Sequence, residues 1–253
     1  MFRQKGIRSY FALKKMINFM YLKKSVVFKL FNTLIVPVVT YGCQVWFAET
    51  WFTRNMIEHS PGNRLSVIAK DPLERLHLTF LKWLLGVSRK TSNAAVWGDC
   101  GRYPLAVQIS KQAFKYYDRL RMLETNDNNC IVKHAFKEQK HLNMKWYNRM
   151  NSMRNLLINQ GSSMQLYPSR LRSLLKEKFE QIWDSERHQN KKLSFYNSIK
   201  KTFSFEHYLN INLKINELKR VAQFRMSAHK YNVETGRYGI KRNNVQDLQP
   251  LFN

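Results

Sequence analysis

The chain has 253 residues, and its 43 lysines and arginines against 17 aspartates and glutamates give a formal net charge of +26 at pH 7. Charge of one sign opposes compaction, so this excess indicates a polyanionic partner and argues against an enzyme of small metabolites. The hydrophobic fraction of 44% excludes a disordered tail, 9 glycines and 6 prolines disfavour turn-rich all-β folds, and 3 cysteines exclude a disulfide scaffold. We therefore expect an all-α protein with one large domain or two small ones.

The sequence contains no segment that is expected to span a membrane. The longest apolar run, residues 34–48, is interrupted by Pro37, Gly42 and Gln44, and it is shorter than the ~18 residues that a spanning helix needs. No acidic residue precedes Glu49, a composition that mitochondrial transit peptides share. The helical pattern of this segment runs without a break into apolar positions typical of a core, which argues against a transit peptide. We therefore expect an intracellular, nuclear protein without a membrane partner, with mitochondrial targeting as the alternative.

Helical spacing of apolar residues organises the N-terminal part of the chain. It predicts one helix over residues 7–20 and a second over residues 26–34. Pro37 should kink or end the second helix, because proline lacks the N–H that an interior helical position donates. Residues 58–63 combine Ser, Pro, Gly and Asn, which predicts a loop.

Turn residues mark the next two helices. Asp71 followed by Pro72 is typical of a helix start, with an N-cap acceptor and proline at the first helical position. Gly86 is placed to cap the same helix at its C-terminus. Between residues 92 and 103 a short helix is predicted, and Gly98 and Gly101 should end it.

Pro104 opens the strongest amphipathic pattern in the chain. The apolar positions of one helix face are Leu105, Ile109, Ala113, Tyr116, Leu120 and Leu123. Lys111, Lys115 and Arg119 follow at four-residue intervals and form a basic stripe beside that face. Further helices are predicted at residues 130–140, 146–157, 169–183 and 213–228. No fixed-period repeat or heptad run occurs, which disfavours a solenoid or a coiled coil.

A series of short segments extends over nearly the whole chain, at residues 5–13, 30–46, 68–72, 74–77, 80–86, 92–98, 101–105, 224–225, 229–230 and 234–238. No segment is specific alone, but the ordered set resembles the region after the catalytic palm in reverse transcriptases of non-LTR (LINE-type) retrotransposons. The resemblance implies a thumb-like helical bundle over residues 1–103 and a post-thumb helical region over residues 104–253. It also implies that the palm and fingers of the parent polymerase are partners.

The chain departs from that family in the residues that carry its chemistry. Polymerisation needs two adjacent aspartates on a hairpin, with a third nearby, to hold two Mg²⁺ ions. No Asp-Asp dipeptide occurs, and the aspartates are scattered: Asp71, Asp99, Asp118, Asp127, Asp184 and Asp247. The upstream endonuclease and the Cys/His-rich knuckle of such elements are also missing. We therefore expect no catalytic residue, cofactor or polymerase activity in this chain, and Mg²⁺ only in the full parent enzyme.

Other chemical sites have simpler explanations. Cys130 and His134 stand four residues apart, but a structural zinc site needs about four ligands and no Cys-x₂₋₄-Cys pair accompanies them. Glu177, Glu180 and Asp184 lie among lysines and arginines on a predicted helix, where surface ion pairing is expected. Neither Gly-x-Ser-x-Gly nor Gly-x-Gly occurs, so the sequence predicts no nucleophile elbow and no phosphate-cradling loop.

The uncompensated basic residues are the candidate functional feature, because a merely solvated surface mixes both signs of charge. Aromatic residues are interleaved with them around residues 89–103 and 225–238. Basic groups neutralise phosphates and aromatic faces stack on unpaired bases. By contrast Trp46, Trp83 and Trp183 follow apolar spacing and are expected in the core. The candidate nucleic-acid-binding residues are Lys14, Lys15, Lys23, Lys24, Arg89, Lys90, Trp97, Arg102, Tyr103, Lys111, Lys115, Arg119, Arg225, His229, Lys230 and Arg237.

We expect sequence-tolerant binding of RNA and DNA, in which lysine and arginine contact the phosphates of a template–product duplex or of element RNA. A continuous positive groove would favour this function. Two alternatives stay open. One is a domesticated or organellar helical module that binds a protein or the ribosome, which a large exposed apolar patch would favour. The other is a decayed retrotransposon remnant without a selected function.

Overall fold

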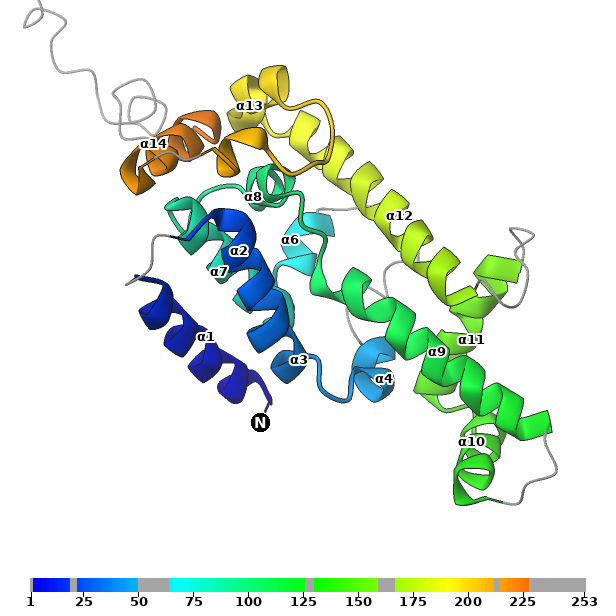
Figure 1. Cartoon of the computed structure of the whole chain (residues 1–253). Coiled ribbons are helices and arrows are strands. Elements are labelled where there is room, and N and C mark those ends of the chain that lie inside the picture. Colours follow the sequence, from blue (N-terminus) through cyan, green and yellow to red (C-terminus); the bar gives the residue numbers. More distant parts are fainter. Residues whose placement is uncertain are drawn as a thin grey trace, which may run out of the picture.

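The computed structural model describes residues 2–18, 22–49, 64–125, 130–158, 167–211 and 214–227. Within these ranges the chain forms helices joined by turns and loops, and no β-strand occurs there, so the predicted all-α class is confirmed (Figure 1). Over the same ranges every helix lacks the length or the apolar character that crossing a membrane requires. The predicted loop at residues 58–63 lies outside the described residues.

The N-terminal helices form one side of the molecule (Figure 1). They are α1 (Phe2–Asn18), α2 (Lys24–Leu30), the π-helical turn η1 (Phe31–Ile35) and α3 (Val36–Val39). The chain follows a helical path through Pro37, which has no N–H to donate, and the wide π turn stands directly before α3, the helix that contains this proline. Phe31 and Ile35, on that turn, are fully buried. α1 packs against α3, η1 and α7.

The middle of the chain follows the local signals of its sequence in most places. Its helices are α4 (Cys43–Trp46), η2 (Phe47–Glu49), α6 (Arg64–Ile68), α7 (Pro72–Leu85) and α8 (Asn93–Cys100). Oδ1 of Asp71 accepts a hydrogen bond from the N–H of Leu73 at 2.8 Å, and Gly86 ends α7 with a φ of +66°. Both predicted caps are confirmed. Gly101 ends α8 with a φ of +53°, whereas Gly98 lies inside that helix.

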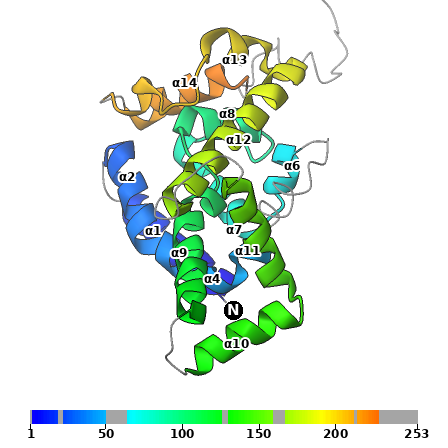
Figure 2. The same cartoon turned by 90° about the vertical axis from the view of Figure 1, so that its right-hand side faces the viewer.

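The C-terminal helices build on α9, which packs against α4, α7, α10 and α12. They are α9 (Leu105–Thr125), α10 (Ile131–His141), α11 (Lys145–Ile158), α12 (Tyr167–Gln189), η4 (Lys191–Leu193), α13 (Ser194–Ile199), η5 (His207–Leu209) and α14 (Ile215–Arg225). α12 lies alongside α9, and α13 and α14 lie across the top of the molecule in both views (Figure 2). α13 and the 3₁₀ turns were not predicted.

The buried face of α9 is wider than its sequence pattern predicts. Ile109 and Ala113 are buried as expected, but Tyr117 is fully buried and Tyr116 is only partly so. The reason is a second packing surface, because the Tyr117 ring contacts Phe136 of α10 and aromatic residues of α11.

One hydrophobic cluster of buried side chains extends from α1 to α14. It contains Trp183 as predicted, and Trp46 and Trp83 pack against it while partly exposed. Residues on both sides of position 103 belong to the same cluster. The division into regions 1–103 and 104–253 therefore stays a prediction, and the core does not mark it.

Candidate nucleic-acid interface

A buried carboxylate joins three helices in the interior. Glu74, on α7, is 3% exposed. Its Oε1 accepts hydrogen bonds from Nδ1 of His77 at 2.7 Å and from Nε1 of Trp97 at 3.1 Å. Its Oε2 accepts from the backbone N–H of Leu105 at 2.8 Å. Because the carboxylate is the acceptor, Nδ1 of His77 carries the proton. These bonds hold α8 and the start of α9 against α7.

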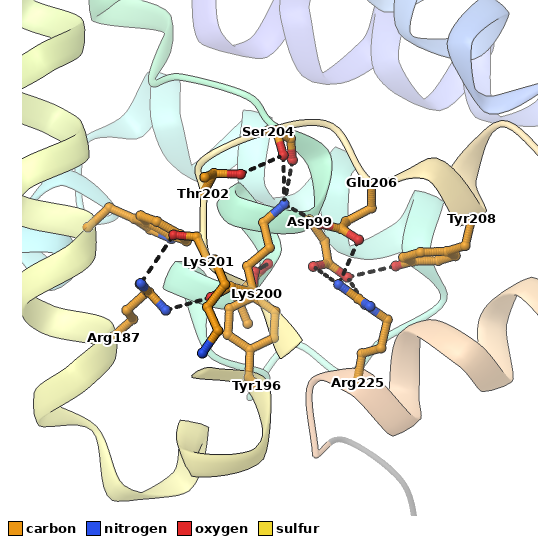
Figure 3. A network of polar contacts seen from close by, with 12 residues as sticks. Asp99, Arg187, Tyr196, Lys200, Lys201, Thr202, Ser204, Glu206, Tyr208 and Arg225 are labelled. Carbon is orange, nitrogen blue, oxygen red and sulfur yellow. Dashed lines mark hydrogen bonds and ion pairs between the residues drawn. The ribbon is translucent and has the colours of Figure 1, made fainter. Parts of the chain in front are cut away.

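A second buried network ties the C-terminal segments to α8 (Figure 3). Asp99, which is fully buried, accepts hydrogen bonds from Nε of Arg225 at 3.1 Å and from the hydroxyl of Tyr208 at 2.9 Å. Arg225 also pairs with Glu206 at 2.8 Å, and Glu206 pairs with the buried amine of Lys200. Burial and the charge of Asp99 raise the pKa of Tyr208, so its hydroxyl stays protonated and donates.

The two networks contain the acidic residues Glu74, Asp99 and Glu206. In the same region Asp184, whose side chain is 54% exposed, pairs with the buried guanidinium of Arg187 at 2.6 Å. Residues 74–77, 92–98 and 224–225, which the sequence pattern singled out, supply several of the side chains involved, and residues 101–105 supply the backbone N–H of Leu105. Apart from Glu74, these carboxylates are paired with Arg187, Lys200 and Arg225, so the networks leave the excess positive charge of the surface nearly unchanged.

Five positive side chains gather around the C-terminal end of α7, and we call them the basic cluster: Lys14, Lys24, Lys82, Arg89 and Lys219. Nζ of Lys14, on α1, lies 5.8 Å from the ring centroid of Trp83. Lys82, in the last turn of α7, donates from Nζ to the carbonyl oxygen of Arg89 at 2.7 Å. These contacts bring α1 and the loop after α7 to one place.

α14 completes the basic cluster from the other end of the chain (Figure 1). The aliphatic stem of Lys219 occupies the space that a Cβ would take at Gly86, so glycine permits this close approach. Nε2 of Gln223 donates to the carbonyl oxygen of Gly86 at 2.7 Å. Lys219 lies close enough to Lys24, at the start of α2, for their charges to interact.

The basic cluster has no internal counter-charge. In the part of the chain that the structure describes, no carboxylate forms an ion pair with any of its five cations. Burial, and secondly the charge of Lys219, lower the pKa of Lys24. Burial lowers the pKa of Lys82 to about 8. The fold therefore holds cations where desolvation and mutual repulsion oppose their charge.

The other predicted cations occupy two surfaces. Lys15, Lys23 and Lys90 are exposed, and each adjoins a member of the basic cluster in sequence. Lys115 and Arg119 are on α9, beside its buried face as predicted, and Lys111 is half-buried there. This α9 stripe lies apart from the basic cluster, because α9 runs away from α14 (Figure 1).

Of the two aromatic candidates, Trp97 lies in the interior and Tyr103 is half-buried. Trp97 is fully buried and bonded to Glu74, so the prediction that it contacts nucleic acid is wrong. The hydroxyl of Tyr103 donates to Glu180, and its ring packs 4.8 Å from that of Phe203. Phe179 also packs against this ring, and Nζ of Lys176 lies 5.0 Å from its centroid. Stacking on a base needs an open ring face, so Tyr103 is corrected to a packing residue as well.

Two predicted phosphate ligands are also committed to internal partners. The guanidinium of Arg102 donates to Asn32 and lies 5.2 Å from the ring centroid of Phe28. Arg225 is neutralised by Asp99 and Glu206. An arginine already paired with carboxylates gains little from a phosphate, so Arg225 is removed from the candidate interface. Arg102 has no carboxylate partner among these contacts, and its role in binding stays a prediction.

Three further candidates, His229, Lys230 and Arg237, lie outside the described residues. Sequence reasoning missed Lys82 and Lys219. Lys82 carried a local signal, because a lysine in the last turn before a C-capping glycine faces the negative end of the helix dipole. Lys219 carried none, since its place depends on a contact with Gly86 that is distant in sequence.

Among the described residues, no three His, Cys, Asp or Glu side chains are grouped so that they could hold a metal ion. Comparison of the chain with known protein families, with curated proteins and with solved structures finds no match.

Proposed function

We propose that this chain binds RNA and DNA without reading their sequence, through phosphate contacts made by the basic cluster and the lysines beside it. The observation that carries the proposal is the convergence of five cations from separate segments with no carboxylate paired to them. Such an arrangement costs folding stability, and a phosphate backbone supplies the counter-charges that the protein lacks.

The geometry favours backbone contacts over base readout. The stems of Lys14, Lys24, Lys82 and Lys219 are half-buried, which fixes the position of their charged ends. A lysine ammonium is a point charge and carries little base specificity, whereas phosphate contacts fix the register of the ligand. A surface of this kind tolerates any sequence.

The ordered segments that resemble non-LTR retrotransposon reverse transcriptases extend the proposal. In a parent enzyme of that kind, the palm and fingers would supply the aspartates and Mg²⁺, and this region would grip the template–product duplex or element RNA. For the chain alone we propose binding without polymerisation.

Exposed apolar residues support a protein contact as a second candidate function. Leu34, Tyr41 and Val45 are 45%, 67% and 66% exposed, and the stretch that holds them, residues 30–48, contains no charged residue. Scattered apolar exposure is ordinary, but several such residues along one uncharged stretch favour a protein partner. This contact is compatible with nucleic-acid binding at the basic cluster.

Two triple variants with the same loss of charge test where nucleic acid binds. The cluster variant is Lys14→Gln/Arg89→Gln/Lys219→Gln, and the stripe variant is Lys111→Gln/Lys115→Gln/Arg119→Gln. We expect the cluster variant to lose affinity for a labelled duplex and for single-stranded RNA, with a salt slope lower by about one per lost contact. Thermal unfolding of both variants checks that they fold. An effect confined to the stripe variant would move the interface to α9.

A further inference from the structure

Phe11 is an exposed aromatic residue surrounded by positive charge on the outer face of α1. Its side chain is 59% exposed. Arg8, Lys14 and Lys15 stand three or four residues from it along the helix, and residues at these spacings are neighbours on a helix surface. Arg8 and Lys15 are exposed, and Lys14 belongs to the basic cluster. The helix therefore presents a flat apolar ring among cations.

Tyr10 holds this ring in place from the protein side. The two ring centroids are 5.4 Å apart, at an interplanar angle of 51°. Tyr10 is 3% exposed and makes edge contacts with Phe80 and Trp83, at centroid distances of 6.5 and 6.4 Å. Phe11 thus rests on the aromatic core while most of its surface faces solvent. A ring that is positioned before binding loses less entropy when a ligand stacks on it.

We infer that Phe11 stacks on an unpaired base of a single-stranded nucleic acid whose phosphates are held by Arg8, Lys15 and the basic cluster. The inference rests on the proposed function and adds its ligand class. The cations can contact the phosphates of both single-stranded and double-stranded nucleic acid. The ring can stack only on a single strand, because a duplex hides the faces of its bases. The protein therefore prefers single-stranded to double-stranded nucleic acid.

Other exposed aromatic residues fit this role less well. Tyr41 lies in the uncharged stretch of residues 30–48, away from phosphate-binding groups in sequence. Phe195 and Phe224 pack edge to face against each other, with centroids 5.1 Å apart. Trp97, an aromatic candidate from the sequence, is buried. Phe11 differs from these in having three cations within four residues on one helix and a ring that contacts the buried Tyr10.

The test uses the full chain and three substitutions at one position. Phe11→Ala removes the ring, Phe11→Leu keeps an apolar side chain without a π face, and Phe11→Trp enlarges the π face. Fluorescence anisotropy measures the affinity for oligo(dT) of about 20 nucleotides and for a duplex of the same length. Tyr41→Ala is the control, because it removes an exposed ring that has no cation beside it in the sequence.

We expect Phe11→Ala and Phe11→Leu to weaken oligo(dT) binding about 5- to 150-fold, the range observed for loss of one base–aromatic stack. Duplex binding should change less than about twofold, since phosphate contacts remain. Phe11→Trp should bind oligo(dT) at least as tightly as the unaltered protein, and Tyr41→Ala should bind both ligands unchanged. Because Phe11 is exposed, the melting temperature should stay unchanged in all variants.

Several outcomes would overturn the inference. Wild-type affinity of Phe11→Leu for oligo(dT) would mean that the ring makes an apolar contact and does not stack. Loss of binding to vesicles containing phosphatidylserine, with oligo(dT) binding intact, would assign Phe11 to a membrane surface. If Phe11→Ala binds both ligands normally, only the inference fails. If the unaltered protein binds neither ligand, the proposed function fails first.

Discussion

Glu74 shows how much a single side chain determines in this fold. The sequence places it near the start of a predicted helix, where an acidic residue favours the helix dipole. The structure instead turns its carboxylate inward, to three donors on α7, α8 and α9. The buried position of Trp97 follows from the same contact. Sequence reasoning could not separate a buried tryptophan beside basic residues from an exposed one, because the deciding partner is distant in sequence.

Replacing Glu74 by glutamine should destabilise the protein. The amide has one acceptor oxygen in place of two, and its NH₂ group would face a donor, so one buried N–H loses its partner. We expect Glu74→Gln to lower the free energy of unfolding by about 1–3 kcal/mol, measured by urea titration. Glu177→Gln, at an exposed site on α12, should change it by less than about 0.5 kcal/mol. Equal stability of the two variants would contradict the role assigned to Glu74.

Lys82 gives the interface a dependence on pH. Its pKa of about 8 is below the ordinary value of 10.5 because of burial. Between these two pH values the unfolded chain binds more protons than the folded one, so the contribution of Lys82 to folding stability rises with pH there. The sign is opposite for polyanion binding, because deprotonation removes a positive charge from the basic cluster.

We therefore expect affinity for duplex DNA to fall between about pH 7 and about pH 9, by up to about fivefold for one phosphate contact at physiological salt. Fluorescence anisotropy at constant ionic strength measures the change. Lys82→Arg keeps its charge throughout this range and should show a smaller decrease. The prediction fails if the unaltered protein and Lys82→Arg respond to pH in the same way.

Individual helices were predictable where their ends carry local signals. Asp71, Pro72 and Gly86 fix the bounds of α7 through an N-cap, a preset φ and a left-handed C-cap, all of which act within one turn. The prediction that Gly98 ends a helix is wrong, because this glycine is needed for contacts with residues that are distant in sequence. A side chain there would meet Trp183 and Tyr196, so the glycine serves the packing of α8 against α12 and α13.

Gly42 and Gly101 both have positive φ, but a side chain would meet neighbouring atoms only at Gly101. Gly42 has a φ of +66°, and no atom lies within 4 Å of the position that a Cβ would take there, whereas a Cβ at Gly101 would meet the backbone of Ser204 at 2.7 Å. We expect Gly42→Ala to cost about 1–2 kcal/mol from strain alone. Gly101→Ala should cost about 1–3 kcal/mol more, because the chain beside Asp99 must move. Urea titration compares them, and equal losses would contradict the packing role of Gly101.

At the scale of the whole molecule, the sequence predicted that positive charge is the functional feature but not where it gathers. Lys14, Lys24 and Arg89 were named individually from composition and spacing. Their assembly with Lys82 and Lys219 depends on α14 docking at the end of α7, a contact between distant parts of the chain. Arg225 was misassigned for the same reason, since its acidic partner Asp99 is also distant in sequence.

The salt dependence of nucleic-acid binding tests the central claim most directly. Each phosphate contact releases condensed counterions, so log K should fall linearly with log[salt], with a slope of about −0.7 to −0.9 per contact. For five or six contacts, which the basic cluster and one neighbouring lysine would make, we predict a total slope of about −4 to −5. Duplexes of unrelated sequence should give the same slope. A flat response to salt would contradict nucleic-acid binding as the main function and would favour the protein contact at residues 30–48.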